Sequence, residues 1–519
     1  MDLPPRQPLA TRLVAVFAAA KLALHLTVLA ITPYGVHRDE FLYFSMGRHL
    51  RLWRMDFPPL IAILGNIQRA LFHDSLAAAR VLPALEGTLV LVLTALIARE
   101  LGGRTFAQML AMLAVLMAPV FLRAANLFQP VVLDQLWWTL ALFALARIVR
   151  ADGRSVRTWW IIFGVACGFG LLTKFSILFF AVAALCALLV TPMRRSLATP
   201  WPWIAAAIML VLGSPSISGQ IVLGFPVLEQ MRALQSTQLE HVTWTGFVLG
   251  QILLIGPAAL LLAIVGAASL VSSRTMRAFA VLGWSCIFAF LILLLLHGKS
   301  YYAAPIYPTL LAAGAVRVEQ FQPVRSVRLG GWVRWSVAAA ILIFGVVILP
   351  ISVPILSPAA TSAYTMRIGA APALRTNQGQ MDRLPQDFAD MLGWEGQARA
   401  LAHAYDSLSP EEQREAVIIG DNYGEAGAAE FYAAKYGLPE VVSAAGSWWF
   451  FGPPARRGAV AVTIGVPQAK LAQVYADVRS AGSAISPWSV SEERDVPVLI
   501  GRNPRISLRQ LWPSLAGRN

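Results

Sequence analysis

The chain has 519 residues, of which 57% are hydrophobic and 13% are charged, and its mean hydropathy is +0.62. This composition excludes an ordinary soluble globular protein. The net charge of +14 does not indicate a nucleic-acid-binding protein, because residues 1–359 carry +15 and residues 360–519 carry −1. The basic surplus therefore belongs to the apolar part, where membrane topology and anionic lipid explain it better than nucleic acid does.

Apolar stretches of about 17–25 residues are candidate membrane spans, and this sequence holds about eleven. They are residues 12–32, 81–98, 106–123, 128–149, 158–172, 175–191, 203–222, 245–272, 278–296, 302–318 and 334–356. With a cytoplasmic N-terminus, every short inner loop is rich in arginine, as the positive-inside rule requires. We therefore expect a multi-pass protein of the bacterial inner membrane, with its C-terminal residues periplasmic or extracellular.

Three parts are expected along the chain. Residues 1–356 form a transmembrane catalytic domain, and residues 34–80 within it form the first outer loop. Residues 360–519 form a small α/β domain outside the membrane, because strand-like and helix-like segments alternate there, which favours a parallel sheet. The expected strands are Ala416–Ile419, Ala459–Val466 and Val496–Ile500, and the expected helices are Glu425–Tyr436 and Ala469–Val478.

The first outer loop contains two amphipathic stretches, Glu40–Met55 and Ile61–Phe72. Basic residues interleaved with aromatic ones are typical of helices that lie in the membrane interface. A solvated amphipathic connector is the alternative interpretation.

Asp39 and Glu40 follow the first apolar span directly, with Arg38 before them. A carboxylate pair at the end of a membrane helix is poorly placed to stabilise a core. It is well placed to meet a substrate whose head is polar and whose tail lies in lipid. The alternative is a solvated loop in which Arg38 is a surface salt-bridge partner of little energetic value.

Other polar residues interrupt the apolar segments. Asp134 lies within membrane depth, where an acid is costly and indicates function, or else a structural partner for an arginine or a tryptophan. Lys174 either serves function or extends to the interface. Lys299 precedes Tyr301 and Tyr302, which either bind a phosphate with it or belong to an interfacial aromatic belt. The expected topology places all these residues and Asp39 at one membrane face, which favours the functional interpretation.

These residues resemble the GT-C class of membrane glycosyltransferases, and most closely glycosyltransferase family 39, the protein O-mannosyltransferases and lipid A aminoarabinose transferases. The likeness extends across most of residues 10–320 and includes Arg38–Glu40, Leu133-Asp134, Thr173-Lys174, Arg80 with Pro83, and Lys299–Tyr302. Residues Asn422–Gly427, Tyr436–Pro439 and Ser447–Pro453 also resemble bacterial members of that family. One departure is Phe57-Pro58-Pro59, where the aminoarabinose transferases have Glu-Lys-Pro with a phosphate-binding lysine.

The resemblance implies a GT-C fold with about eleven transmembrane helices and an inverting transfer of sugar. The donor would be a polyprenyl-phosphate sugar, and the acceptor a glycan, a glycolipid or a protein hydroxyl at the outer face. Asp39 would be the base, and no protonating acid is required because a lipid phosphate is already a good leaving group. Glu40 and Asp134 would orient the substrates. The candidate phosphate-binding residues are Arg38, Lys174, Lys299, Tyr301 and Tyr302.

No cofactor is implied, and the sequence has no Asp-x-Asp metal motif. Metal independence is favoured, with Asp39 and Asp134 as the alternative pair for a divalent ion. Trp448, Trp449 and Glu425 are candidate acceptor-binding residues of the C-terminal domain. The alternative for the two tryptophans, which belong to an aromatic run, is that they dock this domain onto the membrane part.

Two other functions remain open at this stage. In a transporter, Asp39, Asp134 and Lys174 would form an ion or proton pathway, but the charges gather at one face and no repeated halves are evident. The second is a non-catalytic membrane partner whose outer domain binds polymer.

Overall fold

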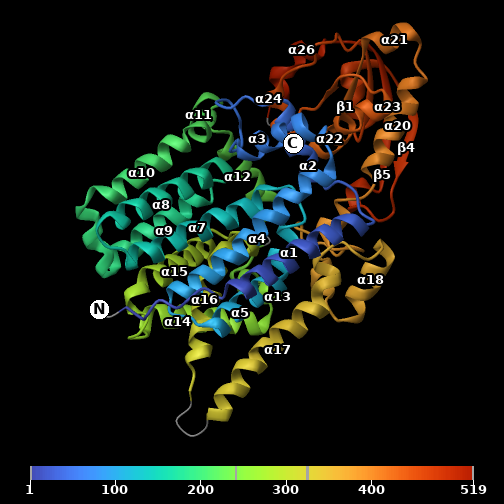
Figure 1. Cartoon of the computed structure of the whole chain (residues 1–519). Helices are drawn as coiled ribbons and strands as arrows, with labels where there is room; N and C mark the ends of the chain where they lie inside the picture. Colours follow the sequence, from blue (N-terminus) through green and yellow to red (C-terminus); the bar gives the residue numbers. More distant parts are fainter. Residues whose placement is uncertain (1–2, 240–241, 323–326, 517–519) are drawn as a thin grey trace. The chain divides into compact units, whose positions relative to one another are not determined.

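The computed structural model describes residues 3–239, 242–322 and 327–516, and the chain divides into two compact units (Figure 1). The helical unit comprises Met1–Ile31, Arg80–Ser218 and Arg232–Ile355. The α/β unit comprises Thr32–Ala79, Gly219–Met231 and Leu356–Asn519. Residues 34–79, which the sequence predicts to lie in an outer loop, thus belong to the same unit as the C-terminal residues. The domain boundaries expected from the sequence follow membrane topology instead and stay a prediction.

All eleven apolar stretches of the sequence contain helices. Six helices are long and apolar enough to cross a membrane, and the number rises to nine if each bent helix pair is one span, within the described residues. These features describe a multi-pass membrane protein. The helices that lie wholly or largely in the helical unit are α1 (Thr11–Ile31), α4 (Leu76–Glu100), α5 (Thr105–Met117), α6 (Pro119–Ala124), α7 (Pro130–Arg150), α8 (Gly153–Thr173), α9 (Ile177–Val190), η1 (Pro192–Ala198), α10 (Pro200–Leu212), α11 (Ser214–Val222), α13 (Trp244–Ile255), α14 (Pro257–Ser272), η3 (Arg277–Phe279), α15 (Ala280–Leu295), η4 (Ser300–Ile306), α16 (Tyr307–Gln320) and α17 (Val327–Ser352). The residues of α12 (Pro226–Thr237) are divided equally between the two units.

The stretch 245–272, predicted as one span, is bent by 110° between α13 and α14. Gly256 lies at the bend with φ +84°, a conformation that favours glycine, and Pro257 begins the next helix. Proline has no backbone N–H, so the hydrogen-bond ladder of α13 cannot continue through it. The sequence therefore marks this break, although hydropathy alone does not.

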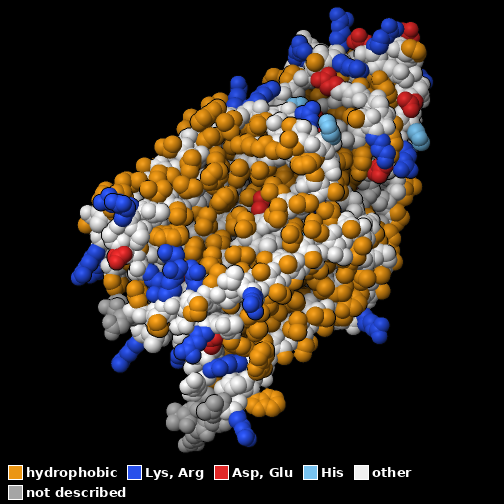
Figure 2. Space-filling model, viewed as in Figure 1, with side chains coloured by type: hydrophobic (Ala, Val, Ile, Leu, Met, Phe, Trp, Pro, Cys, Tyr) orange, Lys and Arg blue, Asp and Glu red, His pale blue; other side chains and the backbone are white. Residues whose placement is uncertain are grey.

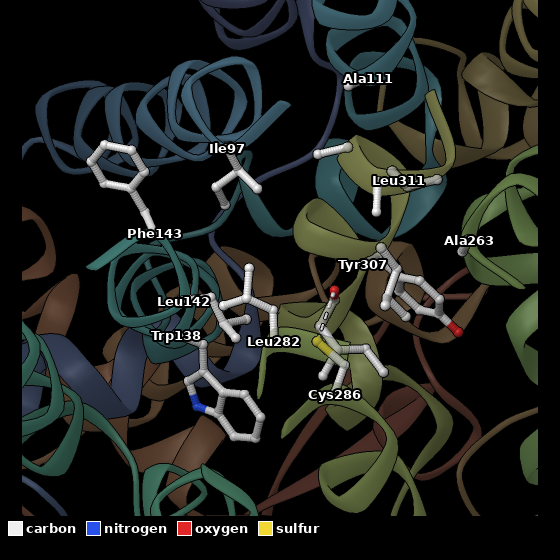
Figure 3. Packing of buried hydrophobic residues seen from close by; sticks show 14 of the residues in the cluster. Ile97, Ala111, Trp138, Leu142, Phe143, Ala263, Leu282, Cys286, Tyr307 and Leu311 are labelled. Carbon is white, nitrogen blue, oxygen red and sulfur yellow. Dashed lines mark hydrogen bonds between the residues drawn. The ribbon is translucent and has the colours of Figure 1, made fainter. Parts of the chain in front are cut away.

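Small residues let the apolar helices pack closely. A Cβ atom at Gly266 of α14 would clash with the Leu310 carbonyl oxygen of α16, and one at Gly314 of α16 would clash with that of Leu262. Such close approach is the usual basis of helix association in membranes. Figure 3 shows larger side chains such as Trp138, Phe143 and Tyr307 filling the core. Hydrophobic side chains also cover much of the surface of this unit (Figure 2).

The α/β unit is built on a five-stranded sheet in the order β2-β1-β3-β5-β4. Its strands are β1 (Ala416–Gly420), β2 (Val441–Val442), β3 (Val460–Ile464), β4 (Tyr475–Ile485) and β5 (Asp495–Pro504). β1 pairs in parallel with β2 and β3, whereas β5 is antiparallel to β3 and β4. The sheet is therefore mixed, and the expectation of a parallel sheet is correct only for its β2-β1-β3 half.

The helix expected over Ala469–Val478 is wrong at its C-terminal end. It stops at Val474, and Tyr475 begins β4. The Tyr475 ring is fully buried and its hydroxyl donates to the Gly458 carbonyl oxygen, so tertiary packing overrides local helix preference there. The helices of this unit are α2 (Arg38–Arg48), α3 (Leu60–Phe72), α18 (Pro358–Arg367), η5 (Ala371–Leu374), α19 (Gln386–Ala389), α20 (Trp394–Asp406), α21 (Pro410–Glu415), α22 (Tyr423–Phe431), α23 (Ala433–Tyr436), α24 (Ser447–Phe451), α25 (Gln468–Val474), η6 (Ser491–Glu493), α26 (Leu508–Leu511) and η7 (Trp512–Leu515).

Candidate active site

The acidic cluster lies at the start of α2, where His37 is the N-cap residue. The Glu40 carboxylate accepts a 2.8 Å hydrogen bond from the His37 backbone N–H, and the Asp39 backbone N–H donates to His37 Nδ1 at 3.1 Å. Together these contacts form a capping box. Glu40 is fully buried, and its hydrogen bond to the His37 backbone stabilises the start of α2. Asp39, in contrast, is half-buried. The role predicted for Glu40 in orienting substrate stays a prediction.

Tyr423, the first residue of α22, holds the Asp39 side chain. Its hydroxyl donates a 2.9 Å hydrogen bond to Asp39 Oδ1. Burial and the neighbouring Asp39 charge raise the pKa of Tyr423 well above its ordinary value, so the phenol keeps its proton and remains a donor. Sequence reasoning missed this residue's role, although Tyr423 lies within the Asn422–Gly427 motif.

Two glycines of that motif explain how Tyr423 reaches Asp39. A Cβ atom at Gly427 would lie 2.6 Å from the Phe41 Cβ, and one at Gly424 would lie 2.8 Å from the Arg38 Cγ. Only glycine permits α22 to approach α2 so closely. The motif therefore serves the contact between these two helices.

Arg38 lies among acidic side chains of the same unit. Its guanidinium is 3.3 Å from Glu492 Oε1, 3.5 Å from Glu493 Oε1 and 3.9 Å from Asp390 Oδ1. It also lies 5.2 Å from the centroid of the Tyr423 ring, a cation–π distance. The positive charge of Arg38 is therefore paired with acidic side chains of the protein, and its guanidinium also contacts the Tyr423 ring. The phosphate-binding role predicted for Arg38 stays a prediction.

The candidate acceptor-binding residues also have protein partners. The Glu425 carboxylate accepts hydrogen bonds from the backbone N–H groups of Asp421 (2.7 Å) and Asn422 (3.0 Å) and so caps α22. Burial, and then the charge of Glu493, raise the pKa of Glu425 above its ordinary value. A role for Glu425 toward an acceptor stays a prediction.

Trp448 is 1% exposed and packs in an apolar cluster with residues of α2 and α3. The Trp449 indole N–H donates to the Trp512 carbonyl oxygen at 3.0 Å, and the Trp512 indole N–H donates to the Trp449 carbonyl oxygen at 3.1 Å. Trp448 and Trp449 therefore both make contacts within the α/β unit. Their roles toward an acceptor likewise stay predictions.

The remaining candidates lie in the helical unit. Asp134 of α7 is 3% exposed, and its Oδ1 accepts a 2.7 Å hydrogen bond from the Ser176 hydroxyl. Lys174 Nζ lies 4.3 Å from the ring centroid of Tyr302 and 5.5 Å from that of Tyr301. The structure thus brings Lys174 together with both tyrosines, and Ser176, which the sequence analysis did not single out, is a hydrogen-bond partner of Asp134.

Lys299 is the N-cap residue of η4 and is half-buried. Within residues 3–239, 242–322 and 327–516, no group of three or more His, Cys, Asp or Glu side chains is placed to hold a metal ion. The cationic and phenolic candidates Lys174, Lys299, Tyr301 and Tyr302 thus belong to the helical unit, whereas Asp39 and its donor Tyr423 belong to the α/β unit.

With its apolar helical unit of bent and broken helices and its small mixed-sheet unit, the chain has a GT-C-type fold like that of the solved structure of ArnT. Residues 56–218 match the family model described as dolichyl-phosphate-mannose-protein mannosyltransferase. That match confirms the resemblance and supports a glycosyltransferase, but it does not include Asp39. Among curated proteins no match was found.

Solved structures give the detailed comparison. ArnT from Cupriavidus metallidurans, bound to undecaprenyl phosphate, aligns with a TM-score of 0.59 and 17% identity. The alignment covers 94% of this chain and 98% of that protein, and the apo state of the same protein gives the same values. The archaeal oligosaccharyltransferase AglB from Archaeoglobus fulgidus aligns with a TM-score of 0.44 and 12% identity, over 86% of this chain and 69% of its own.

Proposed function

We propose that this protein is an inverting glycosyltransferase that moves a sugar from a polyprenyl-phosphate donor to a hydroxyl of a glycan, glycolipid or protein at the outer face of a membrane. The observation that carries the proposal is the half-buried Asp39 carboxylate, which Tyr423 holds at a helix start directly after a membrane-spanning helix. The ArnT-like fold and the mannosyltransferase family match support the donor class.

In the proposed reaction, Asp39 accepts the proton of the acceptor hydroxyl as that oxygen attacks the anomeric carbon. The bond from this carbon to the phosphate oxygen breaks, and the lipid phosphate leaves with the electron pair. The configuration at carbon inverts because attack and departure occur on opposite sides. One carboxylate is enough, since the lipid phosphate leaves without being protonated.

The charge that develops on the phosphate needs fixed cationic and hydrogen-bonding groups. Lys174, with Tyr301 and Tyr302 against it, and Lys299 are the groups that we assign to this task. Asp134, bonded to Ser176, would orient the sugar or the acceptor. This assignment also compensates for the absent lysine at Phe57-Pro58-Pro59.

We further propose that the protein lies in a bacterial inner membrane, with its N-terminus cytoplasmic and its C-terminal residues periplasmic. No cofactor takes part, and transfer continues in excess EDTA. Loss of transfer in EDTA, restored by Mg²⁺ or Mn²⁺, would instead support a divalent ion that takes part in transfer.

The test begins with a strain that lacks the protein. Mass spectrometry of its envelope glycans, glycolipids and secreted proteins identifies the missing product, and complementation compares the wild type with Asp39→Asn and Asp421→Asn. Asp421 is an exposed acid of the same unit, paired with Lys470. We expect Asp39→Asn to lower transfer by about 10²- to 10⁴-fold and Asp421→Asn to have no effect. Full product with Asp39→Asn refutes the proposed base, and solute flux without a glycosidic product identifies a transporter.

A further inference from the structure

A cavity of about 490 Å³ lies in the helical unit where α7 ends and α8 begins. Its wall includes Ile148 of α7, the first turns of α8, and residues of η1 and α10. Because α7 and α8 are both candidate membrane spans, their adjoining ends mark a boundary between lipid and water. The volume is typical of a small-molecule site.

The charged residues that line this cavity are Arg154 and Arg157. At the C-terminal end of α7, Arg147 and Arg150 approach the buried carboxylate of Glu100. Within the described residues Arg154 and Arg157 take part in no such ion pair. The Arg157 guanidinium instead lies 4.9 Å from the ring centroid of Trp201, which holds it at the cavity wall. The two positive charges of the cavity are thus available to an anion.

The hydroxyl groups of the wall do not contribute donors to an anion, so the positive groups of the site are the two arginines and the start of α8. Ser196 Oγ donates to the Met193 carbonyl oxygen and Thr199 Oγ1 donates to that of Ser196, so neither hydroxyl proton is available. The N-cap residue of α8, Asp152, makes no side-chain capping bond. The first backbone N–H groups of this 21-residue helix therefore add to the positive potential at the arginines.

The rest of the wall is apolar and includes Val156, Trp160 and Met193. Tryptophan with arginine at a membrane boundary matches a molecule with an anionic head and an apolar tail. Figure 2 shows Lys and Arg side chains gathered at the end of this unit where the chain's N-terminus lies, next to a broad hydrophobic surface.

We propose that this cavity binds the phosphate group of an anionic phospholipid. Arg154 and Arg157 pair with the phosphate, and the first part of an acyl chain lies against Val156 and Trp160. Neither arginine belongs to the residues that we assign to glycosyl transfer, so this site is independent of the proposed function. A free phosphate ester has the same head chemistry but no tail.

The test uses the full chain purified in a neutral detergent, with its thermal unfolding followed during titration. The probes are dioleoyl phosphatidylglycerol, dioleoyl phosphatidylcholine and glycerol 3-phosphate. We expect only phosphatidylglycerol to raise the unfolding midpoint at micromolar concentrations. An equal shift with phosphatidylcholine, or with glycerol 3-phosphate alone, overturns the proposal.

Variants locate the site. Arg154→Gln with Arg157→Gln should weaken phosphatidylglycerol binding at least about tenfold. The matched control, Arg194→Gln with Arg195→Gln, removes two exposed arginines of η1 that do not line the cavity and should leave binding unchanged. Met193→Trp fills the cavity, keeps every charge and should also abolish binding. Equal losses in the control pair, or full binding in Met193→Trp, overturn the assignment to this cavity.

Discussion

The Tyr423 hydroxyl donates to Asp39 Oδ1 at 2.9 Å across 384 positions of sequence. One carboxylate oxygen is thereby fixed, and rotation of the Asp39 side chain is restrained. A general base works only when its free oxygen lies within hydrogen-bond reach of the acceptor hydroxyl. Tyr423 is therefore a positioning residue for the proposed base, supplied by the C-terminal part of the chain.

We predict that Tyr423→Phe lowers kcat of glycosyl transfer about tenfold and leaves KM for donor and acceptor nearly unchanged. A hydrogen bond to a charged group contributes about 1.5–3 kcal/mol, and here its loss affects the alignment of the base rather than substrate binding. Steady-state kinetics in proteoliposomes, with the donor sugar identified by the product analysis, measure both constants.

Tyr436→Phe is the matched control, because its hydroxyl donates to Glu395 Oε1 at 2.8 Å in the same unit, away from Asp39. It should leave kcat unchanged. If Asp39→Asn abolishes transfer while Tyr423→Phe has wild-type kcat, the positioning role is wrong and the proposed function still stands.

Gly427→Ala should destabilise the contact of α2 with α22. The added methyl group would lie 2.6 Å from the Phe41 Cβ and 3.2 Å from its backbone carbonyl carbon, so the helices must move apart. Overpacking of this kind costs about 1–3 kcal/mol, which exceeds the gain in helix propensity. We expect a lower unfolding midpoint and a partial loss of transfer.

Gly396→Ala provides the comparison for Gly427→Ala, since an added methyl group at this position of α20 meets no atom within 4 Å. It should raise stability by about 0.5–1 kcal/mol. Equal effects of the two substitutions would contradict a close contact at Gly427.

The sequence predicted the apolar helices well, because membrane-spanning segments follow from length and hydropathy alone. It also indicated Asp39 and Asp134 as candidate functional acids, because both lie at or within apolar segments. It could not supply Tyr423 as the partner of Asp39, since that contact depends on how α22 packs against α2. From the sequence, Glu40 is predicted to orient substrate and Glu425 to bind an acceptor. Both also follow the spacing of a capping box, a signal that could have identified their structural role.

Lys174→Gln should raise KM for the donor about tenfold or more, with a smaller change for the acceptor. Its ammonium group lies against the rings of Tyr301 and Tyr302, which hold it in place for a phosphate. Binding of undecaprenyl phosphate to the purified protein, measured by thermal shift, gives a second readout. Lys470→Gln, on an exposed lysine of the α/β unit, is the control. Unchanged donor KM in Lys174→Gln would remove this residue from the phosphate site.

Asp56 gives the protein a pH-dependent stability outside the membrane-spanning segments. Burial raises the pKa of its carboxyl from 3.8 to about 6, although the Ser447 hydroxyl, which donates to Oδ2, acts in the opposite direction. Between these two values the folded chain keeps the Asp56 proton and the unfolded chain loses it. The free energy of unfolding therefore falls as pH rises from about 4 to about 6, by at most about 3 kcal/mol.

Asp56→Asn removes this titration while its side-chain oxygen can still accept from Ser447. The difference in unfolding midpoint between Asp56→Asn and the wild type should be small at pH 4 and should grow in favour of the variant until about pH 6.5. Asp390, whose pKa burial also raises to about 6, titrates in both proteins, so its contribution cancels in the difference. Asp495→Asn, at an exposed acid, should give no such trend. A difference that stays constant from pH 4 to pH 7 would show that the Asp56 carboxyl titrates equally in the folded and unfolded chains.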